Sequence, residues 1–165
     1  MNKTHETITT VLPNLSKKKG LFSLKRDHYT LVLTPQRMVF ALFSKELYKQ
    51  QINDVKQVIE ENKKNKTGFF ASMTDRMLAY TQWFKRYENR DINEIINETS
   101  GNLVINKNEV ISLKVLEFME ATDDSYQENT QSPVLLLKTK TEKYKFVISP
   151  GFDTSAIKDL KNWLI

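Results

Sequence analysis

Two short runs with alternating apolar side chains, at 28–33 and 38–44, flank the turn sequence TPQR at 34–37. Apolar residues at every second position share one face of a β-strand, so each run predicts a strand. Pro35 suits the second position of the turn between them, because its ring holds φ near the value required there. The stretch from His28 to Ser44 therefore predicts a β-hairpin.

The apolar pattern changes to a helical period after this hairpin. Between 45 and 66 the apolar residues follow spacings of four, three and four, which form one stripe of an amphipathic helix: Tyr48, Ile52, Val55 and Ile59. Ser44 is the expected N-cap of this helix. A second helix is predicted over 69–88, and a third, shorter helix begins after Asp91.

Alternating residues return in the second half of the chain. A first strand is expected at 6–12, and further strands are predicted at 103–105, 110–118, 134–139 and 143–148. The polar stretch at 119–132 predicts a loop. A final helix, capped by Asp153, places four apolar residues on one face: Ile157, Leu160, Trp163 and Leu164.

This order of elements predicts an α+β, mainly β fold. We expect a partly open antiparallel barrel whose open end is covered by the C-terminal helix. A chain of 165 residues is one domain by length, so the domain is expected to span 1–165. Within it, a helical insertion at 45–100 lies between the third and fourth strands.

The composition indicates where in the cell the protein is expected, but it does not indicate a reaction. The chain has no cysteine, which excludes disulfides and zinc–thiolate sites and fits a reducing cytoplasm. No apolar run reaches the length of a signal-peptide core or of a transmembrane segment. We therefore expect a cytoplasmic protein. Peripheral attachment to the inner face of the membrane is an open alternative, because the net charge of +5 permits anionic partners.

No arrangement of residues in the sequence indicates an enzyme. The two histidines, His5 and His28, have no spaced partner that would suggest a metal site. The chain also has no nucleophile elbow, HExxH motif or phosphate-binding loop. We expect no catalytic residues, no metal and no cofactor. A small hydrolase without recognisable motifs is retained as an alternative.

A nucleic-acid-binding accessory role is a second, disfavoured alternative. It would require basic residues interleaved with stacking aromatic rings on one face. The last predicted hairpin instead separates the two kinds of residue, with Lys138, Lys140, Lys143 and Lys145 on one face and Tyr144 and Phe146 on the other. Such separation is what a half-buried strand requires.

Five basic residues between the first two strands form the sharpest electrostatic feature: Lys17, Lys18, Lys19, Lys25 and Arg26. They indicate a lipid-binding or anion-binding site, since each basic residue near an anionic membrane contributes about 1 kcal/mol. The competing interpretation, which we favour, is a solvated basic loop that keeps the neighbouring hairpin soluble.

The second predicted helix carries the candidate partner-binding residues: Phe69, Phe70, Met73, Met77, Trp83 and Phe84. Methionine and aromatic side chains suit an adaptable interface with a protein, a membrane or a second copy of this chain. The competing and favoured interpretation is that this stripe packs inside the protein. Trp83 lies off the main stripe, so an exposed Trp83 would indicate a binding surface.

Four segments together resemble a known family: YTLVLTPQRMVFALF at 29–43, RYENRDINEIINETSGNLVINKNEVISLKV at 86–115, VLLLKTKTEKYKFVIS at 134–149 and DTSAIKDLKNWLI at 153–165. They resemble small prokaryotic proteins of the pleckstrin-homology-like (PH-like) fold. The resemblance implies a non-enzymatic binding module that recognises a protein partner or an anionic membrane surface. Phosphoinositide specificity is not expected, because the adjacent Lys25 and Arg26 would point to opposite faces of a strand.

Overall fold

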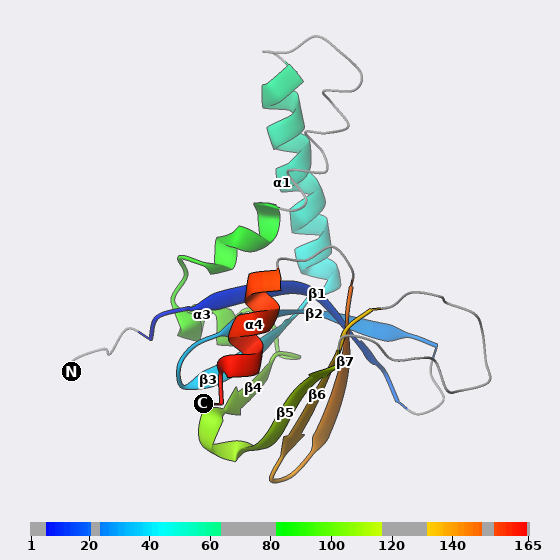
Figure 1. Cartoon of the computed structure of the whole chain (residues 1–165). Helices are drawn as coiled ribbons and strands as arrows, with labels where there is room; N and C mark the ends of the chain where they lie inside the picture. Colours follow the sequence, from blue (N-terminus) through cyan, green and yellow to red (C-terminus); the bar gives the residue numbers. More distant parts are fainter. Residues whose placement is uncertain (1–5, 21–23, 64–81, 117–131, 150–153, 165) are drawn as a thin grey trace.

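Seven antiparallel strands form one sheet, in the order β4-β3-β2-β1-β7-β6-β5 (Figure 1). The structure, a computed structural model, describes residues 6–20, 24–63, 82–116, 132–149 and 154–164. The strands are β1 (Thr10–Lys18), β2 (Arg26–Leu33), β3 (Arg37–Leu42), β4 (Leu103–Asn106), β5 (Val110–Leu116), β6 (Val134–Thr139) and β7 (Lys143–Ile148). Because β4 and β5 are its two edges, the sheet does not close.

The helical elements that the structure describes lie in three parts of the sequence. Between β3 and β4 come α1 (Lys45–Lys63), η1 (Phe84–Tyr87) and α3 (Ile92–Asn97); η2 (Lys107–Glu109) links β4 to β5, and α4 (Thr154–Asn162) follows β7. This confirms the predicted α+β, mainly β composition. No helix within the described ranges is long and apolar enough to cross a membrane.

The sheet curls around its core. Phe40 on β3 stacks on Phe146 on β7 with 4.3 Å between the ring centroids, although β2 and β1 separate these strands in the sheet. In a flat sheet the two strands would lie about 14 Å apart. A bulge between Leu12 and Leu15, where Asn14 adopts φ 59°, increases the local bend of β1.

The predicted bounds of the first strand were wrong. The strand begins at Thr10 and continues through the bulge to Lys18, because Leu15, beyond the bulge, is fully buried in the core. Lys17 and Lys18 consequently belong to a strand and pair with Asp27 and Arg26 of β2. The predicted strand ended at residue 12 because the next two residues are Pro13 and Asn14, and both types are depleted in strands.

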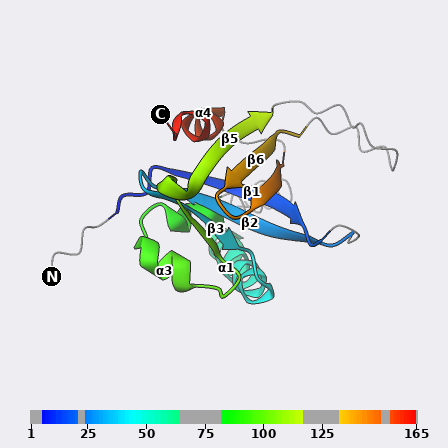
Figure 2. The same cartoon turned by 90° about the horizontal axis from the view of Figure 1, so that it is seen from below.

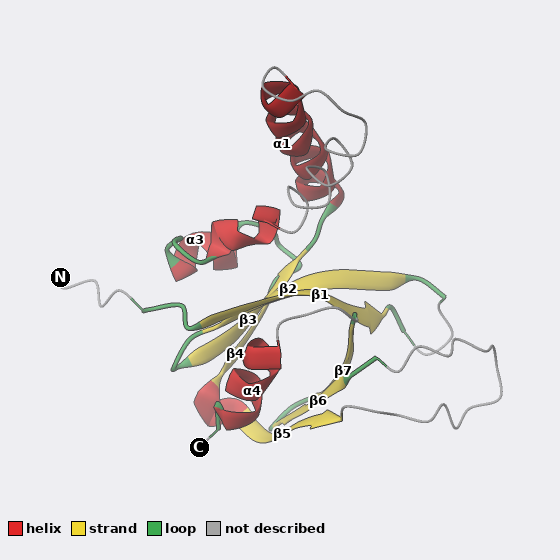
Figure 3. Cartoon of the chain, turned by 45° about the horizontal axis from the view of Figure 1, so that its top comes forward, coloured by secondary structure: helices red, strands yellow, loops and turns green. Residues whose placement is uncertain are grey.

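The predicted hairpin at 28–44 is formed by β2 and β3, and it is buried on both faces. Leu31 and Phe40 enter the main core, whereas Val32 and Val39 pack on the other face against residues that include Tyr87 and Ile95. Figures 2 and 3 show α3 and α4 on opposite faces of the sheet. Burial on both faces explains why both alternating sets of residues in this hairpin are apolar.

Helix α4 covers the open side of the curled sheet. Leu160 and Trp163 belong to the main core and Leu164 packs against it, as predicted. The prediction was wrong at Ile157, which is half-buried outside this core, whereas its neighbour Ala156 is part of the core. The Trp163 Nε1–H donates to the carbonyl oxygen of Thr34, at 2.5 Å. The expected cap, Asp153, lies outside the described residues.

Helix α1 begins as predicted but buries a different row of side chains. The Leu47 N–H donates to the Ser44 hydroxyl at 3.2 Å, which confirms Ser44 as the N-cap. Tyr48 was expected on the buried stripe, yet its side chain is 53% exposed. The buried row contains Leu47, Gln51, Val55 and Ile59. Leu47 and Tyr48 are adjacent and both apolar, so spacing alone does not choose between them.

Candidate functional site

The structure does not gather the five candidate basic residues into one site. Side chains alternate between the faces of a strand, so Lys17 points with Leu15 toward the inside of the sheet, where its Nζ lies 5.0 Å from the centre of the Tyr144 ring. Lys18 and Arg26 pair with each other on the outer face, and Arg26 donates to the Ser16 hydroxyl at 3.2 Å.

The other two candidate basic residues, Lys19 and Lys25, lie just outside β1 and β2. The ammonium of Lys19 forms an ion pair with Asp27 at 3.1 Å, and Lys25 is exposed. Lys17, Lys19 and Arg26 thus have described partners. Among the candidates that lie in β1 or β2, only Lys18 and Arg26 share a face. These five residues lie on several surfaces of the β1–β2 end.

A different basic surface is assembled by the strand register of β5, β6 and β7. Lys138 lies directly opposite Lys143, and Lys145 shares its row with Leu136 and Lys114. The inward positions between them, Leu137 and Phe146 among others, belong to the core. Four exposed lysines therefore occupy neighbouring positions on one outward face, here called the lysine face: Lys114, Lys138, Lys143 and Lys145.

The lysine face borders a shallow groove of about 350 Å³ whose lining includes Ser112, Leu136 and Tyr144. Within the ranges that the structure describes, none of the four lysines forms an ion pair. Like charges directly opposite each other in a sheet are destabilising, so the Lys138–Lys143 pair carries an electrostatic cost in the free protein. A bound anion would relieve that cost.

The sequence pattern predicted only part of the lysine face. The alternation of the last hairpin placed Lys138, Lys143 and Lys145 together, but it also added Lys140, which lies in the turn after β6. Lys114 was missed, because it joins the surface only through the pairing of β5 with β6. The spacing of residues along the chain does not predict which residues of β5 and β6 lie opposite each other.

The candidate partner-binding residues divide between described and undescribed parts of the chain. Phe69, Phe70, Met73 and Met77 lie outside the described residues. Trp83 is buried, with 8% of its surface exposed, so the exposure that would indicate a binding surface is not found there. Its indole N–H donates to Asp54 at 3.1 Å, and its ring packs against Phe43 and Phe84. Trp83 therefore joins α1 to η1.

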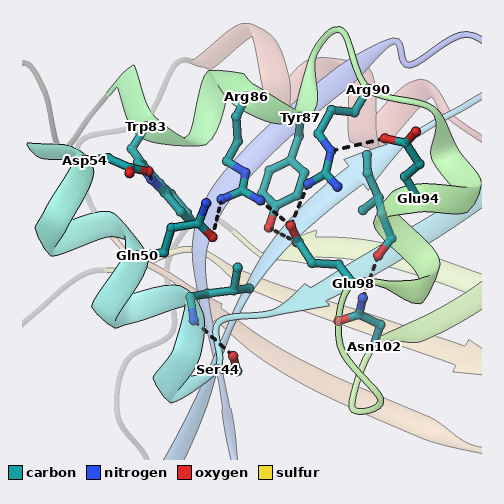
Figure 4. Close-up of polar contacts among 12 residues, drawn as sticks. Ser44, Gln50, Asp54, Trp83, Arg86, Tyr87, Arg90, Glu94, Glu98 and Asn102 are labelled. Carbon is teal, nitrogen blue, oxygen red and sulfur yellow. Dashed lines mark hydrogen bonds and ion pairs between the residues drawn. The ribbon is translucent and has the colours of Figure 1, made fainter.

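A second polar cluster surrounds Glu98 (Figure 4). The Tyr87 hydroxyl donates to the Glu98 carboxylate at 2.7 Å, and Arg90 donates at 2.5 Å. Arg86 donates to the same carboxylate, and its guanidinium lies over the Trp83 ring, 4.5 Å from the ring centre. The carboxylate is occupied by three donors from the chain itself, so this cluster joins η1 to the end of α3 and has a structural role.

Burial and the neighbouring Glu98 carboxylate raise the pKa of Tyr87, and burial together with Glu142 raises the pKa of Tyr144 to about 12. For a group whose pKa is raised by folding, the stabilisation is complete below the unfolded-state pKa and is lost as the pH rises through the folded-state value. We therefore expect the free energy of unfolding to fall above about pH 10.

Urea denaturation at a series of pH values between about 8 and 12 measures this loss. Tyr87→Phe should lower stability at neutral pH, because it removes the bond to Glu98, and should flatten the alkaline decline. Tyr48→Phe, at a half-exposed side chain, is the control and should leave the decline unchanged. An alkaline decline that is equally steep with Phe at position 87 would contradict the role of Tyr87.

The described residues contain no group of three or more His, Cys, Asp or Glu side chains that could hold a metal ion. Comparison with protein-family models, with curated proteins and with solved structures found no match to this chain. The lysine face is therefore the candidate functional site of the described residues.

Proposed function

We propose that this chain is a non-enzymatic, PH-like binding module whose lysine face docks on an anionic membrane surface. The observation that carries the proposal is the pairing of Lys138 with Lys143, next to Lys114 and Lys145, on an exposed sheet face where no described residue forms an ion pair with them. The curled antiparallel sheet with a C-terminal helix across its open side supports the PH-like part of the proposal.

The number of lysines suits weak, reversible membrane association. Each basic residue held near an anionic leaflet contributes about 1 kcal/mol, and the attraction decays within a Debye length. Four lysines on one sheet face can approach a plane together, so their contributions combine to roughly 4 kcal/mol. Ionic strength should therefore control binding strongly.

A nucleic acid suits this face less well than a lipid surface. Binding to single strands commonly uses aromatic rings on which bases stack. Tyr144, the aromatic residue beside the groove, points inward and stacks on Phe146 with 6.2 Å between the ring centroids. Among the described residues of β5–β7, no aromatic ring accompanies the lysines on the outward face.

Vesicle co-sedimentation tests the proposal with a triple variant, Lys114→Gln, Lys143→Gln and Lys145→Gln. At low salt we expect the native chain to bind phosphatidylglycerol-containing vesicles and not phosphatidylcholine vesicles. The triple variant should bind roughly 100-fold more weakly, since three lysines contribute about 3 kcal/mol. High salt should release the native chain.

The matched control carries the same change of charge at Lys17, Lys18 and Lys19, each replaced by glutamine. It should retain most of the binding, because these lysines are divided between two faces. If both triple variants lost the same amount of vesicle binding, overall charge and not the lysine face would account for the binding. Equal binding to neutral and anionic vesicles, or binding to neither, would reject the membrane proposal. Tight, salt-sensitive binding of RNA or DNA in a gel-shift assay would favour the nucleic-acid alternative instead.

A further inference from the structure

A groove of about 430 Å³ lies between the outer face of β2 and the first turn of α1. Thr30 and His28 on β2 contribute to its lining, together with Asn14 at the bulge of β1 and Lys45 at the start of α1. Its aromatic residues are Tyr29, Phe43, Tyr48 and Phe84. We call this site the aromatic groove. Its volume is within the range of sites that hold a small ligand or an anchoring side chain.

Three of these rings, Phe43, Tyr48 and Phe84, form an aromatic wall that packs against the buried Trp83. Phe43 is the centre of the wall, with ring centroids 6.1 Å from Tyr48 and 6.0 Å from Phe84. The buried Trp83 ring lies 5.7 Å from Phe43 and is fixed by its bond to Asp54. Tyr48 is 53% exposed at the margin. Phe43 and Phe84 are half-buried. Partly exposed aromatic rings on a rigid support are typical of sites that anchor a partner side chain.

Two polar side chains of the aromatic groove, those of Thr30 and His28, have no hydrogen-bond partner within the described part of the chain. Thr30 is only 2% exposed, and its hydroxyl makes no hydrogen bond to another described residue. The His28 side chain is exposed and is likewise without a described hydrogen bond. Buried hydroxyls are normally hydrogen-bonded, so the Thr30 hydroxyl is available to a polar group that enters the groove.

The charge around the aromatic groove is positive. Lys45 lies at one side, and His28 is followed on the same outer strand face by Arg26, which pairs with Lys18. Asp27 does not oppose this charge, because it points to the inner face and pairs with Lys19. Glu46 does oppose it in part: hydrogen bonds from its own amide and from Ser44 lower the pKa of its carboxyl, which stays negative beside Lys45. Three basic residues against this one carboxylate leave the surroundings positive.

We propose that the aromatic groove binds an acidic segment of a protein partner, with one aromatic side chain of that segment between Phe43, Tyr48 and Phe84. Its carboxylates would lie along Lys45, Arg26 and Lys18. The occupant follows from charge complementarity, since apolar walls and a line of cations match an acidic, aromatic peptide. This site is separate from the lysine face on β5–β7 and does not depend on membrane binding.

Three blocked pentapeptides test the proposal by amide chemical-shift mapping of the full chain. The first has a central tryptophan flanked by glutamates, the second has lysines in place of the glutamates, and the third has alanine in place of the tryptophan. The first should shift the amides of His28, Thr30, Phe43 and Tyr48, and should bind at least about tenfold more tightly than either other peptide.

Variants on α1 identify the site. Tyr48→Ala and Lys45→Gln should each weaken the acidic peptide several-fold, whereas Val58→Ala, at another exposed apolar position of α1, should not. Shifts that map to β5–β7, or equal shifts with the lysine peptide, would overturn the assignment. Indole-3-acetate that binds as tightly as the peptide would instead identify a small-molecule site.

Discussion

Replacing Glu98 with alanine should lower the free energy of unfolding by about 3 kcal/mol. The carboxylate accepts from Tyr87, Arg86 and Arg90, and the Glu98 side chain is only 10% exposed. Its removal leaves two guanidinium groups close together and a buried phenol without its acceptor. A buried charge that loses its partner is more costly than a surface one, because water cannot fully replace the lost bonds. Urea denaturation followed by circular dichroism measures the change.

Glu94 provides the matched control on the same helix. Its carboxylate lies 3.7 Å from Arg90 but is 65% exposed, so Glu94→Ala should cost no more than about 0.5 kcal/mol. Glu98→Gln should fall between the two, because the amide keeps an acceptor oxygen but loses the charge. Equal costs at positions 94 and 98 would contradict the structural role assigned to Glu98.

Replacing Trp163 with alanine should cost about 3–5 kcal/mol of stability. The indole is 7% exposed in the main core, and its N–H satisfies the Thr34 carbonyl at the turn between β2 and β3. Its loss opens a cavity and weakens the attachment of α4 to the hairpin. Trp163→Phe keeps most of the apolar contact and should cost about 1–3 kcal/mol, mainly from the unsatisfied carbonyl.

Lys158→Ala is the control for α4, because Lys158 is exposed on the same helix. It should change stability by less than about 0.5 kcal/mol. Thermal unfolding followed by far-ultraviolet circular dichroism compares the three variants without relying on tryptophan fluorescence. A Trp163→Ala protein as stable as the Lys158→Ala protein would show that α4 is not needed to cover the core.

Most elements of the fold could be predicted because their signals are local. Alternation around Pro35 predicted the β2–β3 hairpin, and Ser44 and Asp91 marked helix starts that the structure confirms through bonds to Leu47 and Asn93. The errors at β1 and α1 have a shared cause. The bounds of β1 and the buried side of α1 depend on what packs against them, and spacing along the chain does not contain that information.

The sequence by itself determined the order of strands and helices, the N-caps and most of the apolar face of α4, since each depends on residues a few positions apart. Only the tertiary structure decided which charges act together. Strand register placed Lys114 beside Lys138, Lys143 and Lys145, whereas strand alternation divided Lys17 from Lys18. The rotation of α1 left Tyr48 exposed beside Phe43. Register and helix rotation are set by long-range packing, which no local pattern encodes.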